Sequence, residues 1–336
     1  MQKVGFIGLD AEEKTYFEEK LGGQFRLLFY PTPVDADKLD PEIEVLSVFT
    51  NTKVDEALLN KLPRLKLIAC RSTGYDNIDA DAVRARGIAV ANTPGYGSSS
   101  VAEYTFALIL TLSRKLPGIL HQTYSSEPNR RAERGFDLYG KTIGIIGLGN
   151  IGKGVAQIAY GLGMRILAFD TRVDEKIAGW LKIEYVDDLD FLLAQSDIVT
   201  LHIPYTPLNH HLININKLAR MKSNAIVINT ARGDLIDTVA LVKALDRGDI
   251  AGAALDVVED EYLLDPDDLI DLAASQDRAA KATIRHALAL LALERMPNVI
   301  VTNHNAYNTV EALDNIHRLT VENIVGFCAG VRVNLV

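Results

Sequence analysis

Residues 142–160 read TIGIIGLGNIGKGVAQIAY, and this stretch decides the fold. An apolar run that predicts a strand is followed by three glycines and then by residues with helical periodicity. The first glycine permits a tight turn, the second lets the backbone approach a pyrophosphate, and the third allows the helix to pack closely on the strand. Free N–H groups and the positive end of the helix favour phosphate. The stretch therefore predicts a dinucleotide site at Gly147, Gly149, Asn150, Ile151 and Gly152.

An acidic residue at the end of the next strand supports the same interpretation. Asp170 follows the apolar run 165–169 and lies 18 residues beyond Gly152. A carboxylate there accepts hydrogen bonds from both ribose hydroxyls of the adenosine and repels a 2′-phosphate, so NAD is predicted rather than NADP. We interpret Arg172 as a solvated charge beside Asp170.

The rest of the chain repeats an alternation of apolar runs and amphipathic stretches, which predicts parallel sheets covered by helices on both faces. The fold class expected is α/β, with two doubly wound, Rossmann-like domains. The predicted strands are 4–7, 27–30, 45–49, 65–69 and 88–90, and then 142–146, 165–169, 198–201, 225–229, 250–255 and 299–302.

We place the domain boundaries near residues 100 and 300. Residues 101–299 are the predicted cofactor domain, and residues 1–100 with 300–336 the predicted substrate domain, which is discontinuous because a last helix, 310–328, returns to it. The polar segment 113–139 is expected to be a loop or crossover. The Ala/Leu-rich insertion 262–295 is expected to form two helices.

Charge and composition exclude several classes of partner. The formal net charge is −9 and the pI about 5.3, which disfavours nucleic acid and anionic membranes. The longest apolar stretch, 101–112, is too short to span a bilayer. Cys70 and Cys328 form no metal or disulfide motif, and no metal site is predicted. Without a signal peptide pattern at the first residues, a cytoplasmic location is expected.

Three further segments follow predicted strands and carry groups suited to catalysis. Arg232 follows the run 225–229, at the sheet edge where ligands of this architecture bind, and suits a carboxylate. Asp256, Glu259, Asp260 and Glu261 follow the run 250–255; one of these carboxylates can face the nicotinamide and another can orient a base, and the residues alone do not say which. His304 follows the last strand and is a candidate acid/base.

With these motifs in place, the chain resembles the D-isomer-specific 2-hydroxyacid dehydrogenases over essentially its whole length, and most closely their D-lactate dehydrogenase group. The resemblance implies that Arg232 binds the substrate carboxylate, that His304 is the acid/base and that Glu261 is its partner. It further implies substrate contacts at Thr73, Gly74, Tyr96 and Tyr307, and cofactor contacts at His202, Ile203, Asn209, Thr230, Ala231, Arg232 and Asp256.

The sequence departs from the family pattern at two places. Asn303 stands where proline usually precedes the histidine, which frees one backbone torsion beside His304. The insertion after Glu261 is longer than in phosphoglycerate-type relatives, as in D-lactate-type members.

The function expected is reduction of a small 2-keto acid, with pyruvate to D-lactate favoured, by a homodimer that holds substrate in the cleft between its domains. The alternatives are the same chemistry on hydroxypyruvate, glyoxylate, or a phosphorylated, branched or aromatic 2-keto acid. A protein of another class, an NAD-sensing co-regulator without turnover, is the remaining alternative.

Overall fold

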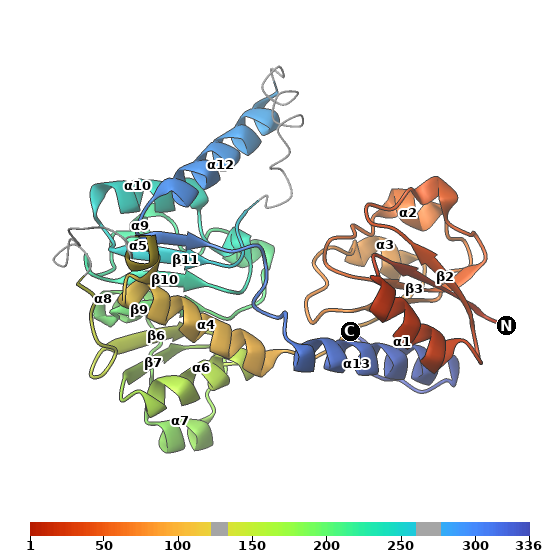
Figure 1. The fold of residues 1–336 in the computed structure, drawn as a ribbon, viewed down its shortest axis with the longest axis horizontal. Helices are drawn as coiled ribbons and strands as arrows, with labels where there is room; N and C mark the ends of the chain where they lie inside the picture. Colours follow the sequence, from red (N-terminus) through yellow and green to blue (C-terminus); the bar gives the residue numbers. More distant parts are fainter. Residues whose placement is uncertain (122–133, 260–276) are drawn as a thin grey trace. The chain divides into compact units, whose positions relative to one another are not determined.

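The computed structural model describes residues 1–121, 134–259 and 277–336, which form two compact units. One unit contains Met1–Gly97 and Asn308–Val336, and the other contains Ser98–Tyr307. Figure 1 shows the ribbon of both. The second boundary follows Tyr307 rather than residue 299, because the last strand pairs within the sheet of the second unit and carries His304 with it.

The first unit is built on a five-stranded parallel sheet in the order β2-β1-β3-β4-β5. Its strands are β1 (Lys3–Ile7), β2 (Arg26–Tyr30), β3 (Ile43–Val48), β4 (Leu67–Cys70) and β5 (Ala89–Ala91). Its helices are α1 (Ala11–Leu21), α2 (Glu56–Asn60), α3 (Ala80–Ala85) and α13 (Val310–Cys328), with a short 3₁₀ turn, η1 (Ala36–Lys38).

Alternate residues of these strands face two separate cores. Ile68 and Cys70 of β4 point to the core beneath α2 and α3, whereas Leu67 and Ala69 point to the core beneath α1 and α13. Both faces of the sheet are therefore covered, which explains why its strands are continuous apolar runs. The C-terminal helix α13 belongs to this unit and packs beside α1 and β4.

The second unit is built on a seven-stranded parallel sheet in the order β12-β11-β10-β9-β6-β7-β8. Its strands are β6 (Thr142–Ile146), β7 (Arg165–Phe169), β8 (Ile183–Tyr185), β9 (Ile198–Leu201), β10 (Ile226–Asn229), β11 (Gly252–Leu255) and β12 (Val299–Val301). Its helices are α4 (Ser98–Ser113), α5 (Leu116–His121), α6 (Asn150–Gly161), α7 (Glu175–Leu181), α8 (Leu189–Gln195), α9 (Ile215–Leu218), α10 (Thr238–Arg247) and α12 (Arg278–Arg295), with 3₁₀ turns η2 (Pro207–Asn209) and η3 (Gly233–Leu235).

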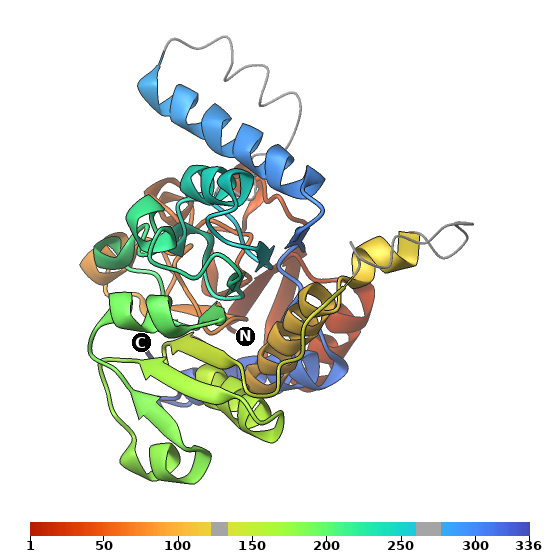
Figure 2. The ribbon, with the colours of Figure 1, turned by 90° about the vertical axis from the view of Figure 1, so that its left-hand side faces the viewer.

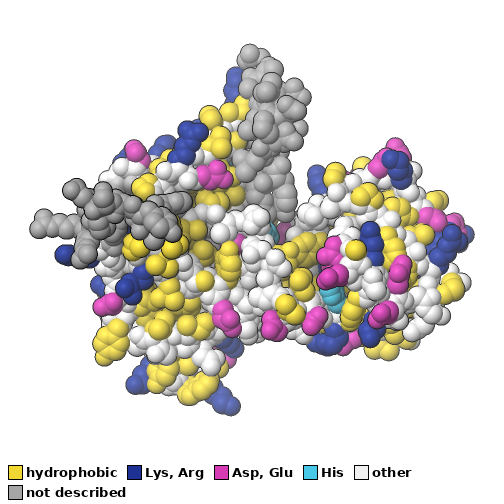
Figure 3. Space-filling model, in the orientation of Figure 1, with side chains coloured by type: hydrophobic (Ala, Val, Ile, Leu, Met, Phe, Trp, Pro, Cys, Tyr) yellow, Lys and Arg dark blue, Asp and Glu magenta, His cyan; other side chains and the backbone are white. Residues whose placement is uncertain are grey.

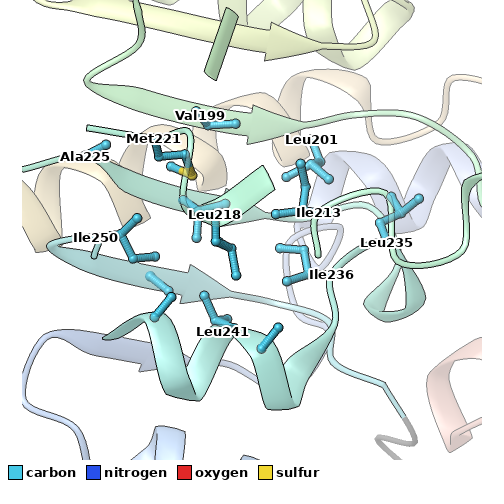
Figure 4. Packing of buried hydrophobic residues seen from close by; sticks show 14 of the residues in the cluster. Val199, Leu201, Ile213, Leu218, Met221, Ala225, Leu235, Ile236, Leu241 and Ile250 are labelled. Carbon is cyan, nitrogen blue, oxygen red and sulfur yellow. The ribbon is translucent and has the colours of Figure 1, made fainter. Parts of the chain in front are cut away.

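Each face of this sheet has its own buried cluster. One cluster joins the strands to α8, α9, α10 and α12, and Figure 4 shows Leu218 and Leu241 of this cluster lying among buried side chains such as Leu201. The other joins the strands to α4, α6 and α7. This doubly wound arrangement confirms the predicted fold class.

One helical segment differs from the expectation, and another is described only in part. The segment predicted as a loop contains α5. The insertion contains one long helix, α12, and its residues 262–276 lie outside the described residues, so the second expected helix stays a prediction. α12 contacts α10 and β12 near the sheet, and its first turns extend away from the rest of its unit (Figures 1 and 2). The short strand β8 was not predicted, because only three residues of it pair with β7.

Helix α4 carries apolar side chains both on its buried face and at an exposed position. Its buried face includes Phe106 and Ile109, while Leu110 is 41% exposed on the same helix. Figure 3 shows hydrophobic side chains gathered on this side of the unit. Even so, no helix in the described part of the chain is long and apolar enough to cross a membrane.

Candidate active site

The glycine loop after β6 has the geometry of a phosphate cradle. Gly147 has a φ of +93°, and a Cβ there would lie 2.7 Å from the carbonyl oxygen of His202. A Cβ at Gly152 would clash with the carbonyl oxygen of Gly147. Gly149, by contrast, caps α6 without a side-chain hydrogen bond, and a Cβ added to it would meet no heavy atom of the described chain within 4 Å. Open space therefore faces the N-terminus of α6, and the first N–H groups of a helix have no partner within the helix.

Asp170 lies beside this loop, at the end of β7. Its Oδ2 accepts a hydrogen bond of 2.6 Å from the Leu148 N–H, and its Oδ1 accepts one of 2.8 Å from the Arg172 N–H. These two bonds hold a half-buried carboxylate next to the glycine loop. Its position fits the predicted contact with the adenosine ribose.

His202 follows β9 and borders the same loop. Its Nε2 lies 2.9 Å from the Thr200 hydroxyl, while its buried Nδ1 has no hydrogen-bond partner among the described residues. Burial lowers the pKa of His202 to about 3, so the ring is neutral at physiological pH. The Ile203 side chain lies 2.5 Å from the Cβ position of Gly147, which places both predicted residues at the loop.

The remaining cofactor candidates make hydrogen bonds within turns or to a neighbouring helix. Asn209 accepts a hydrogen bond from the Thr206 N–H and donates one to the Pro204 carbonyl, which fixes the turn η2. Thr230 is buried, and its hydroxyl lies 3.1 Å from that of Thr105 on α4. Ala231 donates its N–H to the side chain of Asn229. Their contacts with a cofactor stay predictions.

Arg232 lies in a hydrogen-bonded turn at the end of β10. The Asn229 side chain donates a 2.8 Å hydrogen bond to the Arg232 carbonyl. The half-buried guanidinium donates to the Ala231 carbonyl at 2.7 Å. A Cβ on Gly233 would clash with the Val258 carbonyl group, so the turn lies directly against the backbone that follows β11.

Asp256 anchors the turn that carries His304. Its carboxylate is 1% exposed and accepts hydrogen bonds from the Thr302 hydroxyl and from the N–H groups of Asn305 and Ala306. Its carbonyl accepts the His304 N–H at 2.8 Å. The turn is thus held on both sides of His304, although Asn303 stands in place of the family's proline. The predicted contact between Asp256 and nicotinamide stays a prediction.

His304 itself has a φ of +55°, in the left-handed region that residues other than glycine rarely adopt. The ring of Tyr307 lies edge-on to its imidazole, with ring centroids 6.2 Å apart. Strained residues of this kind cluster at functional sites when surrounding bonds hold them in place. The structure therefore brings His304 and Tyr307 together after β12, and their roles toward the substrate stay predictions.

The predicted partner Glu261 lies outside the described residues, and Glu259 is the last residue described before it. Glu259 is buried and pairs with His211. Although we expected no metal, the described residues contain one group of three potential ligands, namely His210, His211 and Glu259, with ligand atoms within 4.8 Å of one another. Since Nε2 of His211 already binds Glu259, the geometry shown is that of a hydrogen-bonded side-chain pair.

In the first unit, the predicted substrate loop follows β4. The Thr73 hydroxyl donates to the Thr93 carbonyl at 2.8 Å, and the Ser72 hydroxyl donates to the Gly74 carbonyl at 2.6 Å. Arg71, 2% exposed, donates to the carbonyl of Ile7 and to a serine on β3, which ties the loop to two strands. Tyr96 accepts the Asn315 side-chain N–H through its carbonyl.

These observations define the class of protein. A glycine loop, an acidic strand end and neutral His202 surround space suited to a dinucleotide, and an arginine and a histidine follow strands of the same sheet. The residues therefore fit NAD, and the arrangement is that of a nicotinamide-dependent oxidoreductase.

Comparison with known proteins defines the family. The model "D-isomer specific 2-hydroxyacid dehydrogenase, NAD binding domain" matches residues 106–306, and the chain belongs to this family. It is 38% identical to 2-hydroxyacid dehydrogenase homolog 1 of Schizosaccharomyces pombe, over 97% of this chain and 96% of that protein. The protein is thus an NAD-dependent D-2-hydroxyacid dehydrogenase.

Two further relatives differ in substrate. A D-3-phosphoglycerate dehydrogenase of Methanocaldococcus jannaschii is 42% identical over 66% of this chain, which spans only 42% of that enzyme. The crystal structure of D-lactate dehydrogenase from Aquifex aeolicus, complexed with NAD and lactic acid, has a TM-score of 0.83 and 36% identity, over 97% of this chain and 96% of that one.

Sequence reasoning missed the pairing of His211 with Glu259. Glu259 stood among four candidate carboxylates, but its partner lies 48 residues earlier, in the loop after a different strand. Periodicity carries no signal for such a pair, because only the order of strands in the sheet brings the two loops together.

Replacing Gly149 with alanine is expected to leave folding intact but to weaken NADH binding about 10- to 100-fold. The reason is that charge-assisted hydrogen bonds worth roughly 1.5–3 kcal/mol would be lost. The added methyl group meets no heavy atom of the described residues within 4 Å and occupies the space proposed for the pyrophosphate. NADH fluorescence titration and thermal unfolding check this. Gly161→Ala at the end of α6 is the control, since it too meets no described atom, and equal NADH affinity in both variants contradicts the assignment.

Acid should destabilise the protein partly through His202. In the unfolded chain this histidine takes up a proton below pH 6.5, whereas in the folded chain it stays neutral until about pH 3. The free energy of unfolding should therefore fall by about 1.4 kcal/mol for each pH unit well below 6.5. Urea unfolding from pH 7 to 4.5 should show a shallower slope for His202→Gln, and an unchanged one for the exposed His210→Gln. Identical slopes in all three proteins contradict the prediction.

Proposed function

We propose that this enzyme interconverts pyruvate and D-lactate with NAD, with His304 as acid/base, Glu261 as its partner and Arg232 as the carboxylate ligand. The observation that carries the proposal is the placement of Arg232 after β10 and His304 after β12, on either side of β11, in the sheet that also bears the glycine loop. The similarity to the lactate-bound D-lactate dehydrogenase of Aquifex aeolicus supports the choice of acid.

Bound NADH supplies a hydride to the 2-keto carbon, and the residues of this chain control the charges that follow. Negative charge builds on the keto oxygen, and the His304 imidazolium donates a proton to that oxygen. A carboxylate at Glu261 stabilises the imidazolium. In the reverse direction, His304 accepts the hydroxyl proton of the 2-hydroxy acid.

Arg232 binds the substrate carboxylate through two parallel hydrogen bonds and so fixes which face of the keto carbon receives the hydride. We propose that Thr73 and Gly74 donate further hydrogen bonds to the substrate and that Tyr96 and Tyr307 line its pocket. His202, Ile203, Asn209, Thr230, Ala231 and Asp256 are proposed to contact NAD, beside Asp170 and the glycine loop.

The identity of the 2-keto acid is tested by following NADH absorbance with a panel of acids. The panel contains pyruvate, 2-ketobutyrate, phenylpyruvate, glyoxylate, hydroxypyruvate and 3-phosphohydroxypyruvate, with NADPH in parallel. Pyruvate with NADH is expected to give the highest kcat/KM. A highest value with 3-phosphohydroxypyruvate would instead follow the similarity to the archaeal phosphoglycerate enzyme. NADH binding without reduction of any acid would favour the sensing role.

We also propose that two copies associate through the α4 side of the cofactor unit, where Leu110 and Leu116 are 41% and 40% exposed. Burial of such apolar area favours association. Sedimentation should show a dimer for the wild type and a shift toward monomer for Leu110→Glu. A wild-type monomer at micromolar concentration contradicts this proposal.

A further inference from the structure

A hydrogen-bonded pair of side chains links two loops at the edge of the cofactor sheet. Nε2 of His211, in the loop after β9, lies 2.5 Å from Oε1 of Glu259, which follows β11. Glu259 is 5% exposed. A buried carboxylate is costly unless it is paired and hydrogen-bonded, so this arrangement constrains both loops.

The second oxygen of Glu259 binds a third segment. Oε2 accepts a 2.9 Å hydrogen bond from the N–H of Thr238, the first residue of α10. Burial raises the pKa of Glu259, but the hydrogen bonds from His211 and Thr238 outweigh it and hold this pKa below its usual value. The ionised carboxylate thus also complements the positive N-terminal end of α10.

The backbone of His211 holds the turn that carries Arg232. Its N–H donates a 2.8 Å hydrogen bond to the carbonyl of Asp234, two residues after Arg232. His211 has a φ of +51°, a backbone conformation that residues other than glycine rarely adopt. On the other side, Gly233 lies against the backbone at Val258, one residue before Glu259.

Resting on the function proposed above, we propose that His211 and Glu259 are a positioning pair that holds the Arg232 turn in the geometry that binds the 2-keto acid. The pair joins the segments after β9, β10 and β11, which are adjacent strands. The glycine loop follows β6, on the far side of β9 from β10 and β11. Loss of the pair should therefore affect the substrate acid far more than NADH.

The test compares Glu259→Gln, His211→Leu, His211→Gln and the double variant Glu259→Gln/His211→Leu. Leucine removes the hydrogen-bond donor of His211, whereas the glutamine amide can still donate to Glu259. Glu184→Gln is the matched control, because it removes the exposed pair between Glu184 and Arg165 on β8 and β7. Steady-state kinetics, NADH fluorescence titration and hydrogen exchange of residues 232–238 are measured for each.

Glu259→Gln and His211→Leu are expected to raise KM for the 2-keto acid about tenfold while NADH Kd stays within about twofold, and His211→Gln should recover most of the loss. The double variant should be no worse than the poorer single variant, because both changes break one interaction. Exchange at residues 232–238 should accelerate in Glu259→Gln and not in Glu184→Gln.

Unchanged KM and exchange in correctly folded variants would overturn the proposal, as would a parallel loss of NADH affinity. Loss of wild-type activity on treatment with EDTA, reversed by Zn²⁺, would also overturn it, since the cluster would then be a metal site that includes His210. If the wild type reduces no 2-keto acid, the proposed function fails. Hydrogen exchange then still decides whether the pair holds the Arg232 turn.

Discussion

His304→Asn is expected to lower kcat for 2-keto acid reduction by about 10²- to 10⁴-fold, the usual contribution of a positioned acid/base. Asparagine is the sharpest replacement, because it tolerates the left-handed backbone found at His304 and keeps the N–H that binds the Asp256 carbonyl. The backbone of the turn is thereby retained, and only the ring that we propose transfers the proton is lost.

Stopped-flow and steady-state measurements with the best 2-keto acid check this expectation. NADH affinity should stay within about twofold, since His304 follows β12 while the glycine loop follows β6. His210→Asn, at an exposed histidine, serves as the matched control and should retain wild-type kcat. A His304→Asn enzyme with near wild-type kcat would show that another group transfers the proton.

Arg232→Lys is expected to lower kcat/KM by about 10²- to 10³-fold, because breaking a buried charge pair costs roughly 3–5 kcal/mol and an ammonium group regains part of it. Lysine keeps the positive charge but cannot form two parallel hydrogen bonds with a carboxylate. The turn itself should survive, since Asn229 binds the backbone carbonyl of residue 232 rather than its side chain.

The measurement is the dependence of rate on 2-keto acid concentration at saturating NADH. Arg247→Lys, at an exposed arginine in the last turn of α10, is the control and should keep kcat/KM within about twofold. An unchanged KM in Arg232→Lys, with the acid still reduced, would place the carboxylate ligand elsewhere.

Much of the fold was predictable because its signals are local. The strand at 142–146 and the helix at 310–328 begin and end as predicted, since each combines a clear hydrophobic period with turn or capping residues at its ends. The glycine loop was predictable for the same reason, because all three glycines act within one strand–turn–helix. Strand β8 was missed because it contributes three residues with little periodicity of their own.

For the candidate site, too, the sequence predicted what depends on local signals and not what depends on distant contacts. The sequence by itself determined the chemistry available, namely an arginine after one strand, carboxylates after the next and a histidine after the last. Only the tertiary structure decided how these groups are held. The Asp256 carboxylate accepts hydrogen bonds from the two residues after His304, whose backbone is in the left-handed region, and the Glu259 carboxylate binds the side chain of His211. The physical reason is that these contacts join residues about 50 positions apart, and only the order of parallel strands in the sheet brings such residues together.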